Sequence, residues 1–138
     1  MAILRRELTA ADLMTIEPVV VSYAALIEEA ERRMREYRVS GLPVVDQDGI
    51  LVGVISQTDF VHLADPDVRS LIRRASVGIR VGEVMSHPPV TVVLTTTLVD
   101  ASRLMTQERV HRVVVVDENQ RPLGVLAAMD FVALFAEG

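Results

Sequence analysis

The sequence contains one unit twice. Sliding residues 12–63 by 71 places onto residues 83–134 requires no gap and makes 18 of the 52 aligned positions identical. Because chance pairing would produce only a few identities, the two segments are copies of one unit. A long period that occurs only twice is typical of two half-domains that cover each other's apolar faces, and not of a solenoid. We therefore expect a fold with pseudo-two-fold symmetry.

Each copy begins with a short extended segment and continues into a helix. The extended segments are residues 17–21 and 88–92, which contain prolines, and proline disfavours helix for the residue that precedes it. Apolar residues then recur at helical spacing. They are Leu26, Ile27, Ala30 and Met34 in copy one, and Leu98, Ala101 and Met105 in copy two. The methionines are expected in the core.

The exposed side of the first helix of copy one carries three potential ion pairs. The corresponding helix of copy two has a potential N-terminal cap. The pairs at i,i+4 spacing are Glu28 with Arg32, Glu29 with Arg33 and Glu31 with Arg35. Such a run is typical of a solvated helix face. In copy two, Thr97 and Asp100 have the spacing of a capping box, which predicts that the helix begins there.

Two strand-like runs joined by a turn follow in each copy. The first pair is residues 42–45 and 50–55, and the turn between them ends in Gly49, which is typical of a hairpin. The second pair is residues 113–116 and 123–126, without the glycine. A second helix is expected at Asp59 and near Met129-Asp130. Each copy thus predicts the order β-α-β-β-α, and the fold class is α+β.

Composition narrows the class of protein. The 138 residues are half hydrophobic but only 4% aromatic, which suits one compact domain or two interlocked half-domains of strands and helices. The net charge of -5 argues against direct contact with nucleic acid. Without cysteine, disulfides and thiolate metal sites are excluded, and the isolated His62 and His87 lack the spacing of metal ligands. No metal site is expected.

The expected organisation has four parts. An N-terminal extension covers residues 1–11, the first repeat residues 12–64, a linker residues 65–82 and the second repeat residues 83–138. The linker shows apolar residues at helical spacing among several arginines, which predicts an amphipathic helix packed on the repeats. The first twelve residues lack the apolar run of a signal peptide, and no uncharged stretch is long enough to span a membrane. We expect a soluble cytoplasmic protein.

The motifs of the two copies resemble those of a known family. Residues 12–15, 39–46 and 53–59 of copy one, and residues 83–86, 110–117 and 124–130 of copy two, each resemble a cystathionine β-synthase (CBS) domain. The tandem is similar to a Bateman module. This resemblance implies a central cleft that holds up to two adenosine-type ligands, such as AMP, ADP, ATP or S-adenosylmethionine.

Two aspartates are the main candidates for ribose binding. Asp59 and Asp130 stand at expected helix starts, where the helix dipole favours a carboxylate that can accept hydrogen bonds from ribose hydroxyls. The alternative is that each is only a helix cap. Ser56 precedes Asp59 by three residues and can donate to a phosphate, whereas the equivalent Ala127 has no hydroxyl. The two sites are expected to differ chemically.

The resemblance also implies which residues surround each ligand. Family members that bind AMP contact its phosphate with a His-Arg pair ahead of the second strand, and His111-Arg112 matches that pair. The alternative for this pair is an exposed strand end or a partner for a nearby carboxylate. The first expected site consists of Thr15, Val20, Val39, Ser40, Gly41, His111, Arg112 and Asp130. The second consists of Ser56, Asp59, Ser86, Thr91, Val110 and His111.

The favoured function is a regulator without catalytic activity. We expect a stand-alone sensor that binds an adenosine-type ligand and signals to a protein partner, as a homodimer and with no required cofactor. A purely structural dimerisation module with vestigial ligand sites is the alternative, and the missing hydroxyl at Ala127 favours it slightly. An enzyme is disfavoured because the sequence has no catalytic triad order, metal cluster or glycine-rich phosphate loop.

Overall fold

The computed structural model describes residues 7–16, 19–68 and 78–137. The chain divides into two compact units, each of which is described by itself. Unit 1 joins the residues up to 18 to those from 90 onward, and unit 2 consists of residues 19–89. Each unit therefore combines the sheet and helices of one repeat with the opening segment of the other repeat.

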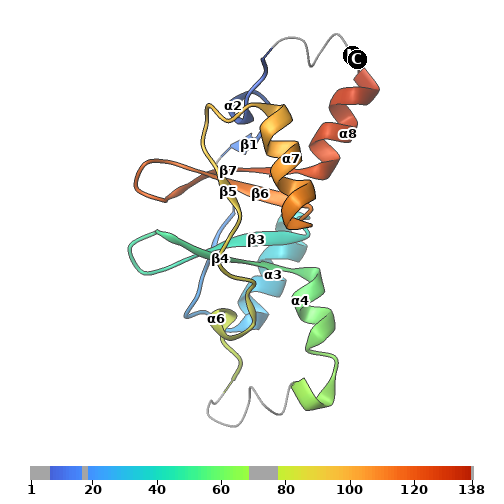
Figure 1. Cartoon of the computed structure of the whole chain (residues 1–138). Helices are drawn as coiled ribbons and strands as arrows, with labels where there is room; N and C mark the ends of the chain where they lie inside the picture. Colours follow the sequence, from blue (N-terminus) through green and yellow to red (C-terminus); the bar gives the residue numbers. More distant parts are fainter. Residues whose placement is uncertain (1–6, 17–18, 69–77, 138) are drawn as a thin grey trace. The chain divides into compact units, whose positions relative to one another are not determined.

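Unit 2 contains a three-stranded sheet in the order β2-β3-β4. Its elements are β2 (Val21–Ser22), α3 (Ile27–Tyr37), β3 (Gly41–Val45), β4 (Leu51–Ser56), α4 (Gln57–His62) and α6 (Val81–Val84) (Figure 1). β2 is parallel to β3, and β3 is antiparallel to β4. The core contains Val21, Ala30, Met34, Leu42, Val44, Ile55 and Val81. Met34 is thus a core residue, as its helical spacing predicts.

Unit 1 repeats this arrangement with one more strand, in the order β1-β7-β6-β5. Its elements are α2 (Ala10–Leu13), β1 (Thr15–Ile16), β5 (Thr91–Val92), α7 (Leu98–Glu108), β6 (Arg112–Val116), β7 (Pro122–Ala127) and α8 (Ala128–Glu137). The core contains Ala10, Val92, Leu98, Ala101, Met105, Val113, Val115 and Leu126. The predicted α+β class and the element order β-α-β-β-α are confirmed, although the first strand of each repeat is only two residues long.

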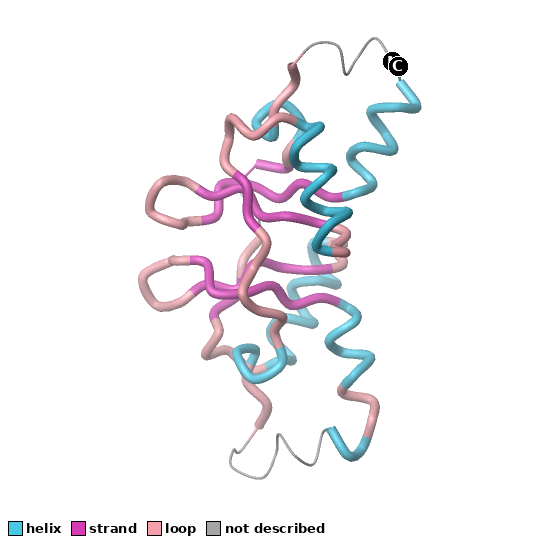
Figure 2. The backbone as a smooth tube through the Cα atoms, viewed as in Figure 1, coloured by secondary structure: helices cyan, strands magenta, loops and turns pink. Residues whose placement is uncertain are grey.

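Each repeat has a hairpin turn, drawn in Figure 2 as a loop between two strands, and an aspartate stabilises both turns. Asp46 Oδ1 accepts hydrogen bonds from the N–H groups of Asp48 and Ile50, and Asp117 Oδ1 accepts the two equivalent bonds. The last turn residue is left-handed in both, with φ of 80° at Gly49 and 62° at Gln120. The aspartate stabilises the turn locally, which explains how copy two forms its hairpin without glycine.

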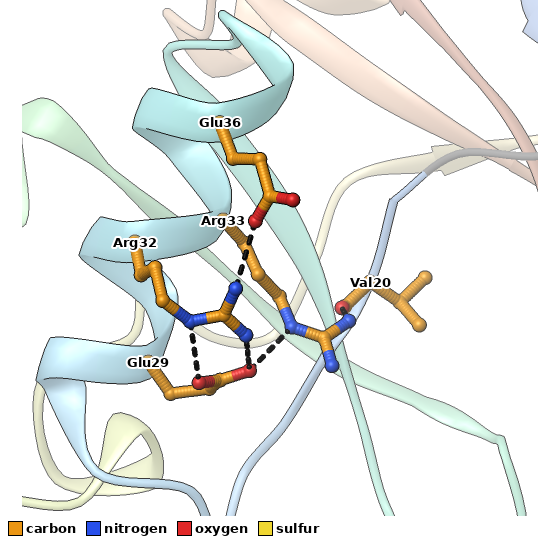
Figure 3. Close-up of polar contacts among 5 residues, drawn as sticks. All are labelled: Val20, Glu29, Arg32, Arg33 and Glu36. Carbon is orange, nitrogen blue, oxygen red and sulfur yellow. Dashed lines mark hydrogen bonds and ion pairs between the residues drawn. The ribbon is translucent and has the colours of Figure 1, made fainter.

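The predicted ion pairs of α3 are partly correct. Arg33 Nε lies 2.9 Å from Glu29, and Arg35 lies 3.4 Å from Glu31, as predicted. Arg32, which the sequence pairs with Glu28, instead binds Glu29 at 2.6 Å and Glu36 at 2.7 Å (Figure 3). An arginine fork reaches carboxylates both one turn before and one turn after it, so spacing alone does not select the partner.

Helix α7 begins as its sequence predicts. The hydroxyl oxygen of Thr97 accepts a hydrogen bond from the N–H of Asp100 at 3.1 Å, which satisfies one free donor of the first turn. In this described part of the chain, the Asp100 carboxylate does not accept a hydrogen bond from the Thr97 N–H, which would be the second bond of a capping box. The cap therefore follows the simpler one-bond pattern.

The opening segment of each repeat pairs with the last strand of the other. β1 is antiparallel to β7, with Thr15 opposite Val125. At the equivalent place in unit 2, Ser86 and Val54 exchange two backbone hydrogen bonds of 3.0 and 2.9 Å. A Cβ on Gly53 would lie 2.5 Å from Met85 Sδ and 2.8 Å from the Ser86 carbonyl oxygen. Glycine is needed there because the segment crosses the strand so closely.

The expected linker helix is described only at its ends. Residues 69–77 lie outside the described residues, while residues 66–68 are helical. Beyond this range, Ile79 packs with Ile27 and Leu63 in a small buried cluster. Within the described residues, no helix is long and apolar enough to cross a membrane.

Candidate functional site

Asp59 and Asp130 occupy equivalent positions at the starts of two helices. Each is the third residue of its helix, α4 or α8, and one oxygen of each carboxylate accepts the N–H of the residue three positions earlier. These bonds measure 2.8 Å from Ser56 and 2.7 Å from Ala127. Both aspartates therefore stabilise their helix starts from the third helical position, whereas the alternative interpretation placed them at the N-cap, which in α4 is Ser56. An ionised carboxylate has about four lone-pair positions, so capping leaves acceptors for a ligand.

The missing hydroxyl at Ala127 does not loosen Asp130. The Ser56 hydroxyl contributes only a long contact of 3.4 Å to Asp59, in addition to its backbone N–H. Since any residue except proline supplies that N–H, Ala127 holds Asp130 as Ser56 holds Asp59. The sequence predicts Ser56 only as a donor to a phosphate and does not predict this main-chain bond.

Ser86 completes a polar cluster with Asp59 in unit 2. Its hydroxyl donates to the second carboxylate oxygen of Asp59 at 3.3 Å, across 27 residues of sequence. Asp59 is only 8% exposed, and a carboxylate this buried requires such partners. The backbone pairing of Ser86 with Val54 on β4 positions the hydroxyl. Three residues that the sequence assigned to one ligand, Ser56, Asp59 and Ser86, are thus brought together.

The segment between α3 and β3 lies beside the same helix start. Gly41 pairs with Ser56 in the β3–β4 register, and the Ser40 carbonyl accepts the N–H of Gln57 at 3.1 Å. In unit 2, Ser40 and Gly41 therefore lie at the N-terminus of α4 together with Asp59. The N-terminal end of a helix favours anions because its free N–H groups point outward.

His111 and Arg112 occupy the equivalent place in unit 1. Arg112 pairs with Ala127 in the β6–β7 register, and the His111 carbonyl accepts the N–H of Ala128 at 2.8 Å. Asp130 lies in the first turn of the same helix, and Thr15 pairs with β7. Unit 1 thus gathers a histidine, an arginine, a carboxylate and a hydroxyl residue where β7 ends and α8 begins.

The environment of Arg112 is unfavourable for its charge. The residue is half-buried, and this burial lowers the pKa of its guanidinium group from the ordinary value. His111, the preceding residue, is exposed. Both side chains carry hydrogen-bond donors that suit an anion such as a phosphate.

The remaining candidates lie on both units. Val20 and Val39 belong to unit 2, and Thr91 and Val110 belong to unit 1. The N–H groups of Val39 and Val110 donate to Met34 and Met105, the equivalent carbonyls near the ends of α3 and α7, and so bring the chain back toward the sheet. Each expected ligand draws residues from both units, and this division between two ligands stays a prediction. The described residues contain no group of three or more His, Asp or Glu side chains arranged to hold a metal.

Comparison of the sequence with known proteins identifies one domain family. The family model of the CBS domain matches residues 10–65 and 81–137. Among curated proteins, the CBS domain-containing protein YhcV of Bacillus subtilis is 33% identical over 119 residues, covering 86% of this chain and 79% of YhcV. The inosine-5'-monophosphate dehydrogenase of Rhodopirellula baltica is 28% identical over 116 residues. That match covers 83% of this chain but only 20% of the enzyme.

Solved structures agree with the sequence matches. The crystal structure of CBSX2 from Arabidopsis thaliana in complex with AMP has a TM-score of 0.81 and 31% identity, and the match covers 94% of this chain and 97% of that one. The CBS domain pair of the protein MJ0100, in complex with 5-methylthioadenosine and S-adenosyl-L-methionine, has a TM-score of 0.82 at 22% identity. The latter similarity concerns the fold alone.

Proposed function

Since this chain belongs to the CBS-domain family and carries two CBS domains in tandem, we propose that it is a regulatory module that binds an adenosine-type ligand. Its role is to report occupancy by AMP, ADP, ATP or S-adenosylmethionine to a protein partner, which amounts to energy sensing if the ligand is a nucleotide. Stand-alone CBS pairs are regulators, and we propose no catalytic activity for this one.

The observation that carries the proposal is the cluster at the start of α8. Asp130 offers carboxylate acceptors for ribose, and His111 and Arg112, which pair with the residues where β7 ends and α8 begins, offer hydrogen-bond donors for a phosphate. A ribose phosphate presents hydroxyl donors beside an anionic group, which is the complementary pattern. The similarity to CBSX2, whose structure contains AMP, supports the same ligand class.

The cluster at the start of α4 favours a ligand with less negative charge. Asp59 is present there, but Ser40 and Gly41 take the positions of His111 and Arg112. We propose that a nucleotide phosphate is bound at the α8 cluster, and that the α4 cluster takes an adenosine group without a strong phosphate contact. The residues assigned to both sites from the sequence, and the repeat boundaries at 12–64 and 83–138, are part of this proposal.

The partner and the assembly are proposed on the family pattern. The chain spans about a fifth of the length of the dehydrogenase relative, so the activity of that enzyme is not carried over. We propose a cytoplasmic homodimer that acts on a separate protein, without direct contact with nucleic acid. The net charge of -5 is consistent with the last point.

A ligand series tests the function. Thermal unfolding is measured with AMP, ADP, ATP, adenosine and S-adenosylmethionine, and calorimetry then gives affinity and stoichiometry for each ligand that raises the melting temperature. A ligand at 100 times its dissociation constant adds about 2.7 kcal/mol to the free energy of unfolding. We expect several degrees of stabilisation with phosphate-bearing ligands. Absence of any shift across the series would remove the sensor function.

The second candidate is a structural dimerisation module. It is favoured by the finding that both aspartates cap their helices, a role that needs no ligand. Sedimentation equilibrium distinguishes the two functions when it is combined with the ligand series. A stable dimer that binds none of the five ligands would support the structural module.

A further inference from the structure

A surface hollow of about 500 Å³ lies within unit 1 at the free edge of its sheet. It is bounded by the edge strand β5, by one side of α7 and by the β6–β7 hairpin. The residues used below are Thr91, Asp100, Arg103 and Leu104, with Val93, Thr96 and Gln120 as reporters. This edge hollow is separate from the cluster at the start of α8, because it adjoins Val116 at one end of β6 while Arg112 is at the other end. A five-residue strand separates its ends by roughly 13 Å.

Unit 2 shows what occupies the equivalent place in the first repeat. There, Arg33 Nη1 donates to the carbonyl oxygen of Val20 at 2.7 Å, and its Nε donates to Glu29 at 2.9 Å (Figure 3). Figure 3 shows the guanidinium group of Arg33 lying between the carboxylate on α3 and the backbone of the edge segment. The first repeat thus covers its sheet edge with its own arginine.

The second repeat keeps the acceptors and loses the arginine. The 71-residue offset aligns Val20 with Thr91, Glu29 with Asp100 and Arg33 with Leu104. Leucine has no hydrogen-bond donor, so the internal bond to the edge carbonyl cannot form in unit 1. The side chain of Leu104 instead packs against the core at the base of the edge hollow.

The carbonyl of Thr91 faces the open edge. In the parallel pairing of β5 with β6, Thr91 is the partner of Val114, whose N–H donates to the carbonyl of Val90 at 3.2 Å. In a parallel ladder, one residue of each pair forms hydrogen bonds to the two neighbours of its partner. Here Val114 is that residue, so the N–H and C=O of Thr91 point away from β6. An edge carbonyl in this position requires a donor from water or from another molecule.

The side-chain carboxylate of Asp100 can also accept a hydrogen bond from another molecule. The Asp100 side chain is 66% exposed, and its ion pair with Arg103 Nη1 is 3.8 Å long, whereas Glu29 in the first repeat is held at 2.6 Å by Arg32. A contact this long contributes little. The edge hollow therefore presents a weakly engaged carboxylate, a strand-edge carbonyl and an apolar base, and the exposed Arg103 is also among its lining residues.

We propose that the edge hollow binds an arginine side chain of a partner protein, which takes the place that Arg33 fills internally in the first repeat. Its guanidinium group donates to the Thr91 carbonyl and to the Asp100 carboxylate, while its methylene groups lie on Leu104. An arginine suits this set because its planar fork serves two acceptors at once and its stem packs on apolar surface. The net charge of -5 attracts a basic segment from a distance.

Nuclear magnetic resonance titration tests the proposal with a defined probe. N-acetyl-arginine methylamide is added to the isotope-labelled chain, and the backbone amides of Val93, Thr96 and Gln120 are followed. We expect saturable shifts at these positions. The neutral isostere N-acetyl-citrulline methylamide, and the Asp100→Asn variant with the arginine probe, should each bind about tenfold more weakly, because a charge-assisted hydrogen bond is lost.

Exchanging the residue types at positions 33 and 104, where the two repeats differ, provides the decisive comparison. Leu104→Arg supplies the internal guanidinium and should abolish the shifts in unit 1. Arg33→Leu removes it from the first repeat and should create new shifts at Ser22, Ala25 and Gly49, the equivalent positions. Arg35→Leu is the matched control, since it removes an arginine from the same helix without uncovering the Val20 carbonyl, and it should create none.

Three outcomes would overturn the proposal. They are an absence of saturable shifts in the native chain, equal affinity for the arginine and citrulline probes, and an unchanged affinity in Asp100→Asn. If Leu104→Arg does not fold, Asp100→Asn and Arg33→Leu still decide the question. Thr91 is also assigned to the second ligand site, but the test uses no adenosine ligand and substitutes no residue of either ligand site, so it can fail or succeed independently of the proposed sensor function.

Discussion

The hydroxyl of Ser86 donates a hydrogen bond to the carboxylate of Asp59 at 3.3 Å, although the two residues lie 27 positions apart and in different repeats of the sequence. The bond forms because the opening segment of the second repeat lies along β4 of the first, where Ser86 exchanges backbone bonds with Val54. A buried carboxylate is thereby satisfied by a residue that the repeat boundaries assign elsewhere.

Removing this hydroxyl should destabilise unit 2. We expect Ser86→Ala to lower the free energy of unfolding by about 1 kcal/mol at neutral pH, the usual contribution of a side-chain hydrogen bond. Urea denaturation of Ser86→Ala, Asp59→Asn and the double variant measures the coupling between the two residues. A coupling free energy of zero would show that the contact contributes nothing to stability.

Met85 and Ser86 lie so close to Gly53 that even a methyl group at that position should not fit. Gly53→Ala places a Cβ against Met85 Sδ and the Ser86 carbonyl, so we expect a loss of about 1–3 kcal/mol in the free energy of unfolding. Adding Met85→Ala should recover only part of the loss, because the backbone carbonyl stays in place. Gly124→Ala, whose Cβ would lie 2.6 Å from the Thr15 carbonyl oxygen, should behave alike. Chemical denaturation at neutral pH checks all three, and unchanged stability in Gly53→Ala would contradict the crossing.

The stabilisation by Glu29 should depend on pH in a definite direction. Hydrogen bonds from Arg32 and then from Arg33 lower the pKa of Glu29 from 4.5 to about 2. Since the pKa is lower in the folded state, the carboxylate stabilises the fold above pH 4.5, and this contribution is lost as the pH falls toward 2. Glu29→Gln should therefore be less stable than the native chain at pH 7 and equally stable near pH 2.

Denaturation series at several pH values measure that difference. Glu28→Gln is the matched control, because it removes another acidic group from the first turn of α3 and so accounts for the loss of one charge near the helix dipole. A stability difference for Glu29→Gln that stays constant from pH 7 to pH 2 would argue against the arginine bonds as its cause.

Arg112 should distinguish a phosphate from a nucleoside. If the sensor function holds, Arg112→Ala should weaken AMP binding by about 1.5–3 kcal/mol, the range for a hydrogen bond to a charged group, and leave adenosine almost unaffected. Arg112→Lys keeps the charge without the planar fork and should recover part of the loss. Calorimetry with both ligands measures the effect, and equal losses for AMP and adenosine would exclude the phosphate role.

Asp130 should affect both ligands together. Asp130→Asn keeps a side-chain oxygen for the N–H of Ala127, so the cap of α8 is retained while the negative charge that favours ribose hydroxyls is lost. We expect weaker binding of AMP and adenosine alike, whereas 2′,3′-dideoxy analogues should be insensitive to the change. An unaltered affinity for AMP in this variant would remove Asp130 from the ligand site.

Much of the fold could be predicted because its signals are local. The alternation of helix and strand patterns, the turn that ends in Gly49 and Thr97 at the start of α7 all act over a few residues, and the duplication allows the helix and strand patterns to be seen twice. The partner of Arg32 was predicted wrongly, because the local spacing of charged residues does not specify which carboxylate an arginine binds. Several carboxylates lie within reach of one flexible side chain, and only its three-dimensional surroundings select among them.

The sequence by itself determined the repeat, the α+β class, the family and the residue types of the candidate ligand clusters. Tertiary structure decided which of these residues meet. The opening segment of each repeat packs on the other repeat, so Ser86 lies beside Asp59 and Thr15 pairs with β7. Tertiary structure also decided that Arg33 reaches the carbonyl of Val20 at the sheet edge, a contact for which Leu104 has no donor. The physical reason is that pairing between distant segments depends on the packing of whole strands and helices, which no local pattern encodes.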